Sequence, residues 1–455
     1  MYRKALTSMY RNSNGPPIIL AIPIWVTMAA SCYLYMTMQD ELVKVPEWFT
    51  LHSTDLLFAL LSVYCLAGVL LTRWRWSAEI ILLLLYALLT ISFIRGALGF
   101  LSSAGVEFRI VAVFVALILF IYFWGHKFQS DWISWNIVVL GWAIVALSAA
   151  RLVLGWDAFI LGRIDPFSYL DPNYGGLRTL NGAAAFMLGQ AALITFNKAF
   201  SEGPITTRSF NWLTLVIFVL TLLISQQRTA IFATLTGLAV IVAFPPTRYR
   251  AVVIVMGSFV IVGCSMILLA AWIDLGGDKL VEYFPSAIRM IIFQQTTFGS
   301  RVLLWSAYLN NYETWPIVER LLGRPFGIPI LAFVTQSQLV EVSPHNGYIV
   351  YLLRIGLVGL LVFIAALIYA LGKSLYVLVV TASRGNPSPP LRLGAAVVAS
   401  QAIFSLTYLL PNEQGLLLAV AFQTISEAFP SFARISLMRS RELSHRLGRA
   451  SGASP

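Results

Sequence analysis

The feature that most constrains this chain is a series of apolar blocks, each about 20 residues long, that recur along nearly its whole length. Of its 455 residues 58% are hydrophobic and only 11% are charged, whereas a water-soluble domain carries roughly 25% charged residues. A soluble core cannot account for so little charge. We therefore expect an integral membrane protein, which excludes soluble enzymes, disordered scaffolds and disulfide-rich secreted domains.

Apolar windows of this length predict about twelve transmembrane helices, hence an all-α, polytopic membrane helix bundle. Nine helices are expected within residues 1–273 and three within residues 347–430, separated by a large, helical outer loop at 274–346 and followed by a basic cytoplasmic tail at 431–455. The expected spans are 17–38, 54–72, 77–94, 108–124, 132–150, 180–197, 210–225, 229–244, 251–273, 347–371, 391–410 and 414–430.

Polar residues weaken the prediction of one span, and the spacing of apolar residues predicts a helix in the outer loop. The sixth span is the weakest of the twelve, because Asn181, Gln190 and Asn197 interrupt it. In the outer loop, residues 299–315 have helical spacing at Val302, Trp305 and Leu309, which predicts a helix.

The distribution of charge predicts the orientation. With the N-terminus in the cytoplasm, the cytoplasmic segments carry 18 Lys and Arg residues against 5 Asp and Glu, which leaves 13 cations and 15 acids on the outer side. This is the positive-inside bias of multi-pass membrane proteins. The net charge of +11 therefore reflects topology and contact with anionic membrane lipids, and nucleic acid is not an expected partner.

The outer cations are mostly arginines, which account for 11 of the 13. A guanidinium group is planar and permanently charged, and it can hold a phosphate through two hydrogen bonds. One interpretation is a pocket for an anionic membrane-embedded ligand such as a lipid diphosphate. The alternative is that these arginines form ion pairs with nearby acids and contact lipid phosphates. The main candidates for the pocket are Arg163, Arg178, Arg228, Arg301 and Arg354.

Two residues stand out by position. Arg228 lies at the tip of the tight hairpin between the seventh and eighth spans, beside the N–H groups that begin a helix, where anions bind well. His345 is the only one of four histidines that borders the large loop, and its ordinary pKa suits proton transfer to or from a hydroxyl. The alternatives are an interfacial anchor for Arg228 and a helix-start role for His345.

Neither a metal site nor a cofactor site is expected. The histidines and cysteines lack ligand spacing, and Asp165 and Asp171, six residues apart in a Pro/Gly-rich turn, are better explained as solvated turn residues. There is no nucleotide-binding glycine loop and no nucleophile elbow. Any reaction must therefore draw its energy from the substrate.

Several segments together resemble the bacterial O-antigen ligase and polymerase superfamily. The hairpin sequence 225–230 (SQQRTA) is similar to the family's Ser/Arg-Thr-Ala turn, although two glutamines separate the serine from the arginine. Residues 299–305 (GSRVLLW) and 322–327 (LGRPFG) resemble its outer-loop motif, and residues 344–360 resemble its HNxYL and GxxGL motif. Residues 171–174 (DPNY) are similar to its NPN segment, with aspartate in first place. The resemblance covers roughly residues 165–360.

Membership of this family would imply a metal-independent, inverting glycosyltransferase of the GT-C-like class in the bacterial inner membrane, with its active site facing the periplasm. The donor would be an undecaprenyl-diphosphate-linked oligosaccharide, and the acceptor a glycan on another repeat unit or on lipid A-core. Arg228 and Arg301 would hold the diphosphate, with Arg178, Arg354 and Arg163 as further contacts, and His345 would orient or deprotonate the acceptor hydroxyl.

Other functions remain open at this point. Within the family, a polymerase that extends O-antigen or exopolysaccharide, with a chain-length regulator as a possible partner, is favoured over a ligase because the chain is rather long. Outside the family, a lipid-glycan flippase or transporter would suit twelve spans. A transporter, however, is expected to have related halves and helices broken near the membrane midplane, and neither pattern is present in the sequence.

The orientation can be tested with reporter fusions. A reporter placed after Pro455 is expected in the cytoplasm, and one inserted near Gly276 outside it, because the positive-inside bias fixes both ends of the chain on the cytoplasmic side. Activity of both reporters on the same side of the membrane would contradict the predicted topology.

Overall fold

The computed structural model describes most of the chain. The described residues are 17–37, 41–45, 49–71, 80–128, 130–155, 158–160, 179–200, 204–225, 227–245, 297–330, 332–335, 338–340, 346–382, 388–406, 408, 415–421 and 424. This part is mainly helical, as the sequence predicts, with two short β-hairpins in addition.

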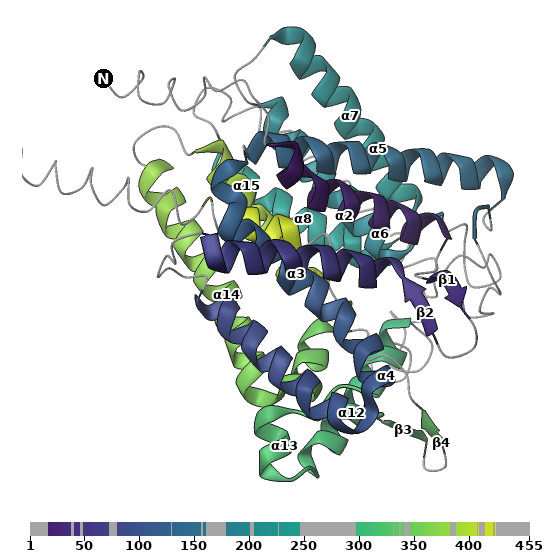
Figure 1. Ribbon diagram of the computed structural model, residues 1–455. Helices are drawn as coiled ribbons and strands as arrows, with labels where there is room; N and C mark the ends of the chain where they lie inside the picture. Colours follow the sequence, from purple (N-terminus) through teal and green to yellow (C-terminus); the bar gives the residue numbers. More distant parts are fainter. Residues whose placement is uncertain are drawn as a thin grey trace, which may run out of the picture.

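The elements follow the apolar blocks closely (Figure 1). In chain order they are α2 (Ile18–Thr37), β1 (Glu41–Val45), β2 (Phe49–His52), α3 (Ser53–Leu71), α4 (Ile80–Trp124), a 3-10 turn (Gly125–Lys127), α5 (Ser130–Leu154), α6 (Gly182–Ala199), α7 (Ile205–Ile224), α8 (Arg228–Ala243), α12 (Thr297–Glu313), α13 (Ile317–Leu322), β3 (Ala332–Thr335), β4 (Gln338–Val340), α14 (Gly347–Ala382) and α15 (Pro389–Phe404). Each hairpin, β1–β2 and β3–β4, is antiparallel.

Six helical segments among the described residues are long and apolar enough to cross a membrane. They lie in α2, α3, the second half of α4, α5, α7 and α14, and two shorter apolar helices are present at Leu84–Gly99 and Arg228–Ala243. The chain is therefore a multi-pass α-helical membrane protein. The total of twelve spans stays a prediction, and the expected ninth span at 251–273 lies outside the described residues.

Helix α4 reverses direction between its two halves. Phe93 and Phe108 stack with ring centroids 4.3 Å apart, although 15 residues of straight helix would separate them by about 22 Å. In Figure 1 the two limbs form a V that points toward α12. The expected third and fourth spans are therefore separate limbs, as predicted, but the residues between them are largely helical instead of forming a loop.

Helix α14 reverses in the same way at Gly356, whose backbone is not helical (φ 69°, ψ −172°). The rings of Tyr351 and Phe363 on either side of it are 4.3 Å apart, which a straight helix does not allow over 12 residues. Gly356 faces Gly323, which has a similar backbone conformation (φ 73°, ψ 169°) and follows α13. The tenth span predicted at 347–371 is thus a short limb followed by a longer one that extends to Ala382.

Helix α6, which corresponds to the weakest predicted span, lies at the centre of the bundle. It packs against α5, α7, α8 and α15, and almost all of its side chains are buried. Gln190 donates to Ser400 Oγ of α15 (2.7 Å), and Asn197 Nδ2 donates to the Pro389 carbonyl (3.1 Å). The polar residues that weaken the sequence signal therefore bond to neighbouring helices instead of facing lipid.

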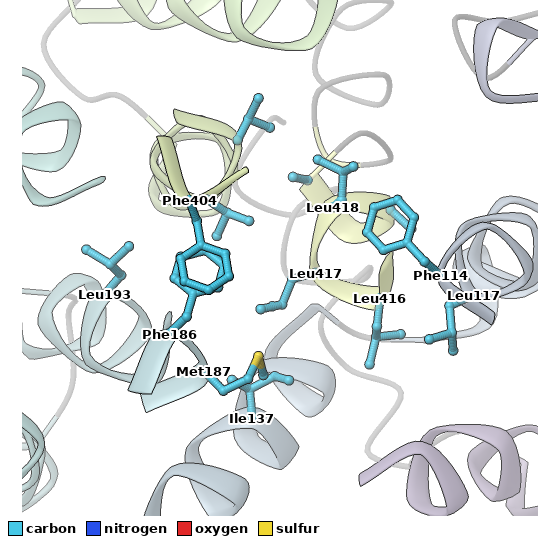
Figure 2. Packing of buried hydrophobic residues seen from close by; sticks show 14 of the residues in the cluster. Phe114, Leu117, Ile137, Phe186, Met187, Leu193, Phe404, Leu416, Leu417 and Leu418 are labelled. Carbon is cyan, nitrogen blue, oxygen red and sulfur yellow. The ribbon is translucent and has the colours of Figure 1, made fainter. Parts of the chain in front are cut away.

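The apolar core surrounds this helix (Figure 2). Phe186 of α6 stacks on Phe404 of α15 with ring centroids 3.9 Å apart and nearly parallel planes. Leu416 and Leu417, after α15, are also buried in this core, together with Phe114 of the second limb of α4. Elements from both ends of the sequence therefore meet around α6.

The segment between the ninth and tenth predicted spans contains the helix expected at 299–315, which is α12. Leu304 and Tyr308 of this helix are buried, together with Ile349 and Leu353 of α14, and Trp305 packs against the same cluster. Leu309 is exposed.

The reversal at Gly356 is expected to be sensitive to any side chain. A Cβ atom there would overlap the Leu321 carbonyl oxygen, and the backbone conformation is one that only glycine adopts easily, so Gly356→Ala should cost about 3 kcal/mol or more. Gly372→Ala in the second limb is the matched control, because a Cβ atom there meets nothing within 4 Å. Thermal unfolding of the detergent-solubilised variants measures the difference, and equal melting temperatures would contradict the described reversal.

Candidate substrate site at a junction of helix ends

The ends of four helices meet at one place, which we call the helix-end junction. It consists of Leu180–Gly182 before and at the start of α6, Gln227 and Arg228 at the start of α8, Asn346–Tyr348 at the start of α14, and Ser405, Leu406 and Tyr408 after α15. Gln227 is buried and its amide donates to the Leu180 carbonyl (2.8 Å). This bond attaches the α7–α8 hairpin to the start of α6.

Tyr408 connects the start of α6 with the end of α15. Its ring lies so close to Gly182 that a Cβ atom on that residue would be 2.6 Å from it, and it stacks on Phe404 with centroids 5.0 Å apart. The start of α6 itself is capped by Asn181, whose side chain accepts from Ala184 N (2.8 Å). Glycine at position 182 is what allows this close approach.

Helix α14 begins at the same junction, and its cap is Asn346. The Asn346 side chain accepts from Ile349 N (3.1 Å) and donates to the Leu406 carbonyl (2.9 Å). Gly347 N donates to the Ser405 carbonyl (2.8 Å), and Tyr348 OH to the Ala402 carbonyl (2.9 Å). The described cap of α14 is therefore Asn346, while His345, for which a helix-start role was the alternative, lies outside the described residues.

Arg228 is exposed at the first position of α8. The preceding Gln227 makes no side-chain cap to the helix, because its amide points to α6 instead. The first N–H groups of an α-helix lack partners within the helix and carry a partial positive charge. A guanidinium group and this helix start together make a place where an anionic group is stabilised.

Two of the other predicted site residues, Arg178 and His345, lie next to the junction in sequence but outside the described residues. Arg178 and His345 directly precede Thr179 and Asn346, which the structure does describe. Thr179 is fixed by a 2.6 Å hydrogen bond to Ser148 and by Arg151, which donates to its carbonyl (2.9 Å). The two described residues that follow Arg178 and His345 therefore lie at the junction or next to it. Arg163, like Asp165 and Asp171, lies outside the described residues, and of Arg301 only its backbone in α12 is described.

Arg354 lies away from the junction, next to the reversal of α14, and its guanidinium group is held by the protein. It forms an ion pair with Glu107 of α4 (2.5 Å) and donates to the carbonyls of Pro325 (3.0 Å) and Ile328 (2.9 Å). The ring of Phe326 lies 5.8 Å from the guanidinium carbon. A diphosphate contact by Arg354 would require release of these interactions, which favours a structural role.

Several other outer arginines also bind protein groups. Arg109 pairs with Asp55 (3.0 Å) and Arg324 with Glu319 (2.9 Å). The buried Arg151 donates to carbonyls at the end of α2 and before α6, including those of Tyr35 (3.1 Å) and Thr179. The ion-pair interpretation therefore describes part of the set, and carbonyl binding by Arg151 is a role that sequence reasoning missed. An arginine close to the C-terminal ends of two helices is the signal that favours such a role.

Among the residues that the structure describes, no group of three or more His, Cys, Asp or Glu side chains has the geometry of a metal site. Metal independence stays a prediction, since Asp165, Asp171 and His345 are outside that part of the chain.

Comparison with models of known protein families and a search of curated proteins gave no match for this chain. Fold and sequence together define the class of protein, a multi-pass α-helical membrane protein with polar residues gathered at a junction of helix ends.

The ion pair between Glu107 and Arg354 is expected to behave as a structural unit. Glu107→Gln leaves a buried guanidinium group without its counter-charge, and removing one partner of such a pair costs about 3–5 kcal/mol when both are buried, less here because Glu107 is partly exposed. We expect Arg354→Met added to Glu107→Gln to recover part of that loss in thermal unfolding. Additive losses in the double variant would contradict a coupled pair.

Proposed function

We propose that the protein is a membrane glycosyltransferase with a GT-C-like fold. It transfers an undecaprenyl-diphosphate-linked oligosaccharide to a glycan acceptor at the periplasmic face of the bacterial inner membrane. The single observation that carries the proposal is the helix-end junction, where the exposed Arg228 lies in the same cluster of contacts as the chain segments that continue from Arg178 and His345. Arg228 and His345 come from two of the segments that resemble the O-antigen ligase and polymerase superfamily, and Arg178 follows a third, residues 171–174, by four positions.

A second observation concerns the helix that carries Arg301. Helix α12 packs on the start of α14 through Leu304, which lies in the same buried cluster as Ile349. This packing brings α12 close to the first turn of α14, and it supports a site in which α12 takes part.

In the proposed reaction the acceptor hydroxyl oxygen attacks the anomeric carbon of the donor, and the bond from that carbon to the diphosphate oxygen breaks with inversion. The acceptor proton passes to His345, which acts as the general base. The undecaprenyl diphosphate leaves with an added negative charge, which Arg228 and Arg301 stabilise through charge-assisted hydrogen bonds. The energy comes from the bond between the sugar and the diphosphate of the donor, so no cofactor is needed.

Within this class we favour a polymerase of O-antigen or exopolysaccharide repeat units over an O-antigen ligase. Chain length is the sequence feature behind this choice. The two are separated by offering purified protein the lipid-linked repeat unit with and without lipid A-core. A polymerase makes a ladder of products without lipid A-core, whereas a ligase makes product only when lipid A-core is present.

The roles of Arg228 and His345 predict different defects. Arg228→Lys keeps the charge but loses the planar fork, and we expect weaker lipid-diphosphate binding and a rate about 10²-fold lower. His345→Ala should leave that binding nearly normal and lower turnover by about 10²–10⁴-fold. A glycan-ladder assay and equilibrium binding of the lipid diphosphate measure the two effects.

Arg208→Lys near the other end of α7 is the matched control, and each variant must first reach the membrane at the normal level. If Arg228→Lys and His345→Ala both make full-length polymer at the normal rate, neither residue is in the active site and the proposed mechanism is wrong.

A further inference from the structure

Helix α13 has an exposed apolar side, although it lies in the segment predicted to be an outer loop. Four of its six residues carry exposed apolar side chains, and their spacing places them on one side of the helix. We call these four residues the α13 face; they are Ile317 (59% exposed), Val318 (57%), Leu321 (40%) and Leu322 (39%). A group of exposed apolar side chains of this kind marks a surface that contacts a membrane or another protein.

Polar contacts fix the remaining side of α13 to the protein. Tyr312 OH of α12 donates to the Arg320 carbonyl (2.7 Å). Glu319 pairs with Arg324 (2.9 Å), and the Arg324 guanidinium carbon lies 4.1 Å from the ring centroid of the buried Trp315. The helix cannot turn its apolar side inward without breaking these contacts, so the α13 face is held outward.

The α13 face continues into the exposed surface of a membrane span. The Leu321 carbonyl oxygen lies against Gly356, where α14 reverses. The exposed side chains of Leu357, Val358 and Leu361 follow directly in the second limb of that helix. Because α14 is long and apolar enough to cross a membrane, its exposed apolar side chains contact lipid, and the α13 face lies next to them.

The first limb of α4 extends the same surface on another side of α13. Arg95 of this limb donates to the carbonyls of Leu322 (3.4 Å) and Gly323 (3.3 Å). Ile91 and Leu98 lie one turn before and one turn after Arg95, hence on the same face of α4, and are 50% and 86% exposed. In Figure 1 α13 lies at the edge of the described structure, and the α13 face is therefore part of an apolar surface that it shares with limbs of α4 and α14.

We propose that α13 is an interfacial helix, seated in the membrane surface on the predicted outer side with the α13 face in the lipid hydrocarbon. Continuity with the exposed surface of α14 favours lipid over a partner protein. Arg320, half-buried beside the face, forms no ion pair with any residue that the structure describes. A cation at the edge of an apolar helix face suits the phosphate groups of lipids.

This inference goes beyond the proposed function and does not depend on glycosyl transfer. Since α13 is bonded to α12 through Tyr312, the seat in the membrane also holds α12 beside the lipid surface.

Contact quenching in lipid nanodiscs tests the proposal on the full chain. The three native cysteines are replaced by alanine, and Val318→Cys then supplies a single thiol that is labelled with bimane. The matched controls are Leu361→Cys, in the exposed apolar surface of α14, and Asn310→Cys, at an exposed polar position of α12. Each protein is measured with lipids brominated near the head-group end of the acyl chains and, separately, with aqueous iodide.

We expect the brominated lipid to lower bimane emission at Val318 about twofold, close to its effect at Leu361, because an interfacial helix buries its apolar side at the head-group boundary. Emission at Asn310 should respond to iodide and not to the brominated lipid. Leu321→Cys repeats the measurement at a second position of the α13 face, and each variant must keep the melting temperature of the cysteine-free protein.

Two results would overturn the proposal. Iodide quenching at Val318 without quenching by the brominated lipid would place the α13 face in water. Protection from both quenchers would show that a protein surface covers the face, either a second copy of this chain or a partner. Quenching by the brominated lipid supports the proposal even where iodide also acts, because an interfacial helix is in contact with both phases.

Discussion

The structure depends on a central helix, α6, whose Gln190 and Asn197 amide groups donate hydrogen bonds to α15. In a membrane an amide without a hydrogen bond costs several kcal/mol, so Gln190 and Asn197 can lie in α6 only where α15 supplies Ser400 and the Pro389 carbonyl. These bonds fix how far along its axis α6 lies against α15. The same register brings the start of α6 to Tyr408 and Gln227, and thus assembles the helix-end junction.

A second constraint holds the outer helices α12 and α13 against the bundle. Helices α4 and α14 both reverse direction, and the loop after α13 contacts both reversals. A Cβ atom at Gly96 of α4 would overlap the Phe326 carbonyl, and Gly323 faces Gly356 of α14. The Arg354–Glu107 pair joins the same three segments by charge. Since α12 shares a buried cluster with the first limb of α14, these close glycine contacts also help to position the start of α14.

Much of this fold could be predicted from the sequence, because apolar blocks of sufficient length have few alternatives in a membrane. The helix starts at Gly182, Arg228 and Gly347 all lie within a few residues of the predicted spans. The reversal in α14 could not be predicted. Apart from Arg354, the residues on both sides of Gly356 are apolar, so the pattern is that of one long span, and the reversal depends on a close partner, Gly323, which is distant in sequence.

The candidate site could be predicted less well than the fold. The reason is that an arginine in this protein can either bind protein groups or face an anion. Residue type and outer position alone give Arg228 and Arg354 the same expected role. What separates them is the surroundings that the fold provides. Arg354 lies among an acid and two carbonyls, which together satisfy a buried guanidinium group, whereas Arg228 begins a helix at the surface. No sequence pattern gives these partners, because Glu107 is 247 positions away from Arg354.

The different surroundings of Arg354 and Arg228 also affect how well each arginine can bind an anion. A buried arginine already paired with carboxylate and carbonyl groups gains little from a further anion, since its desolvation is already balanced by those partners. An exposed arginine beside a helix start can make charge-assisted bonds to an anion without being taken out of a buried site. The burial of Arg151 and Arg354 and the exposure of Arg228 therefore support the helix-end junction over the α14 reversal as the site of the proposed diphosphate.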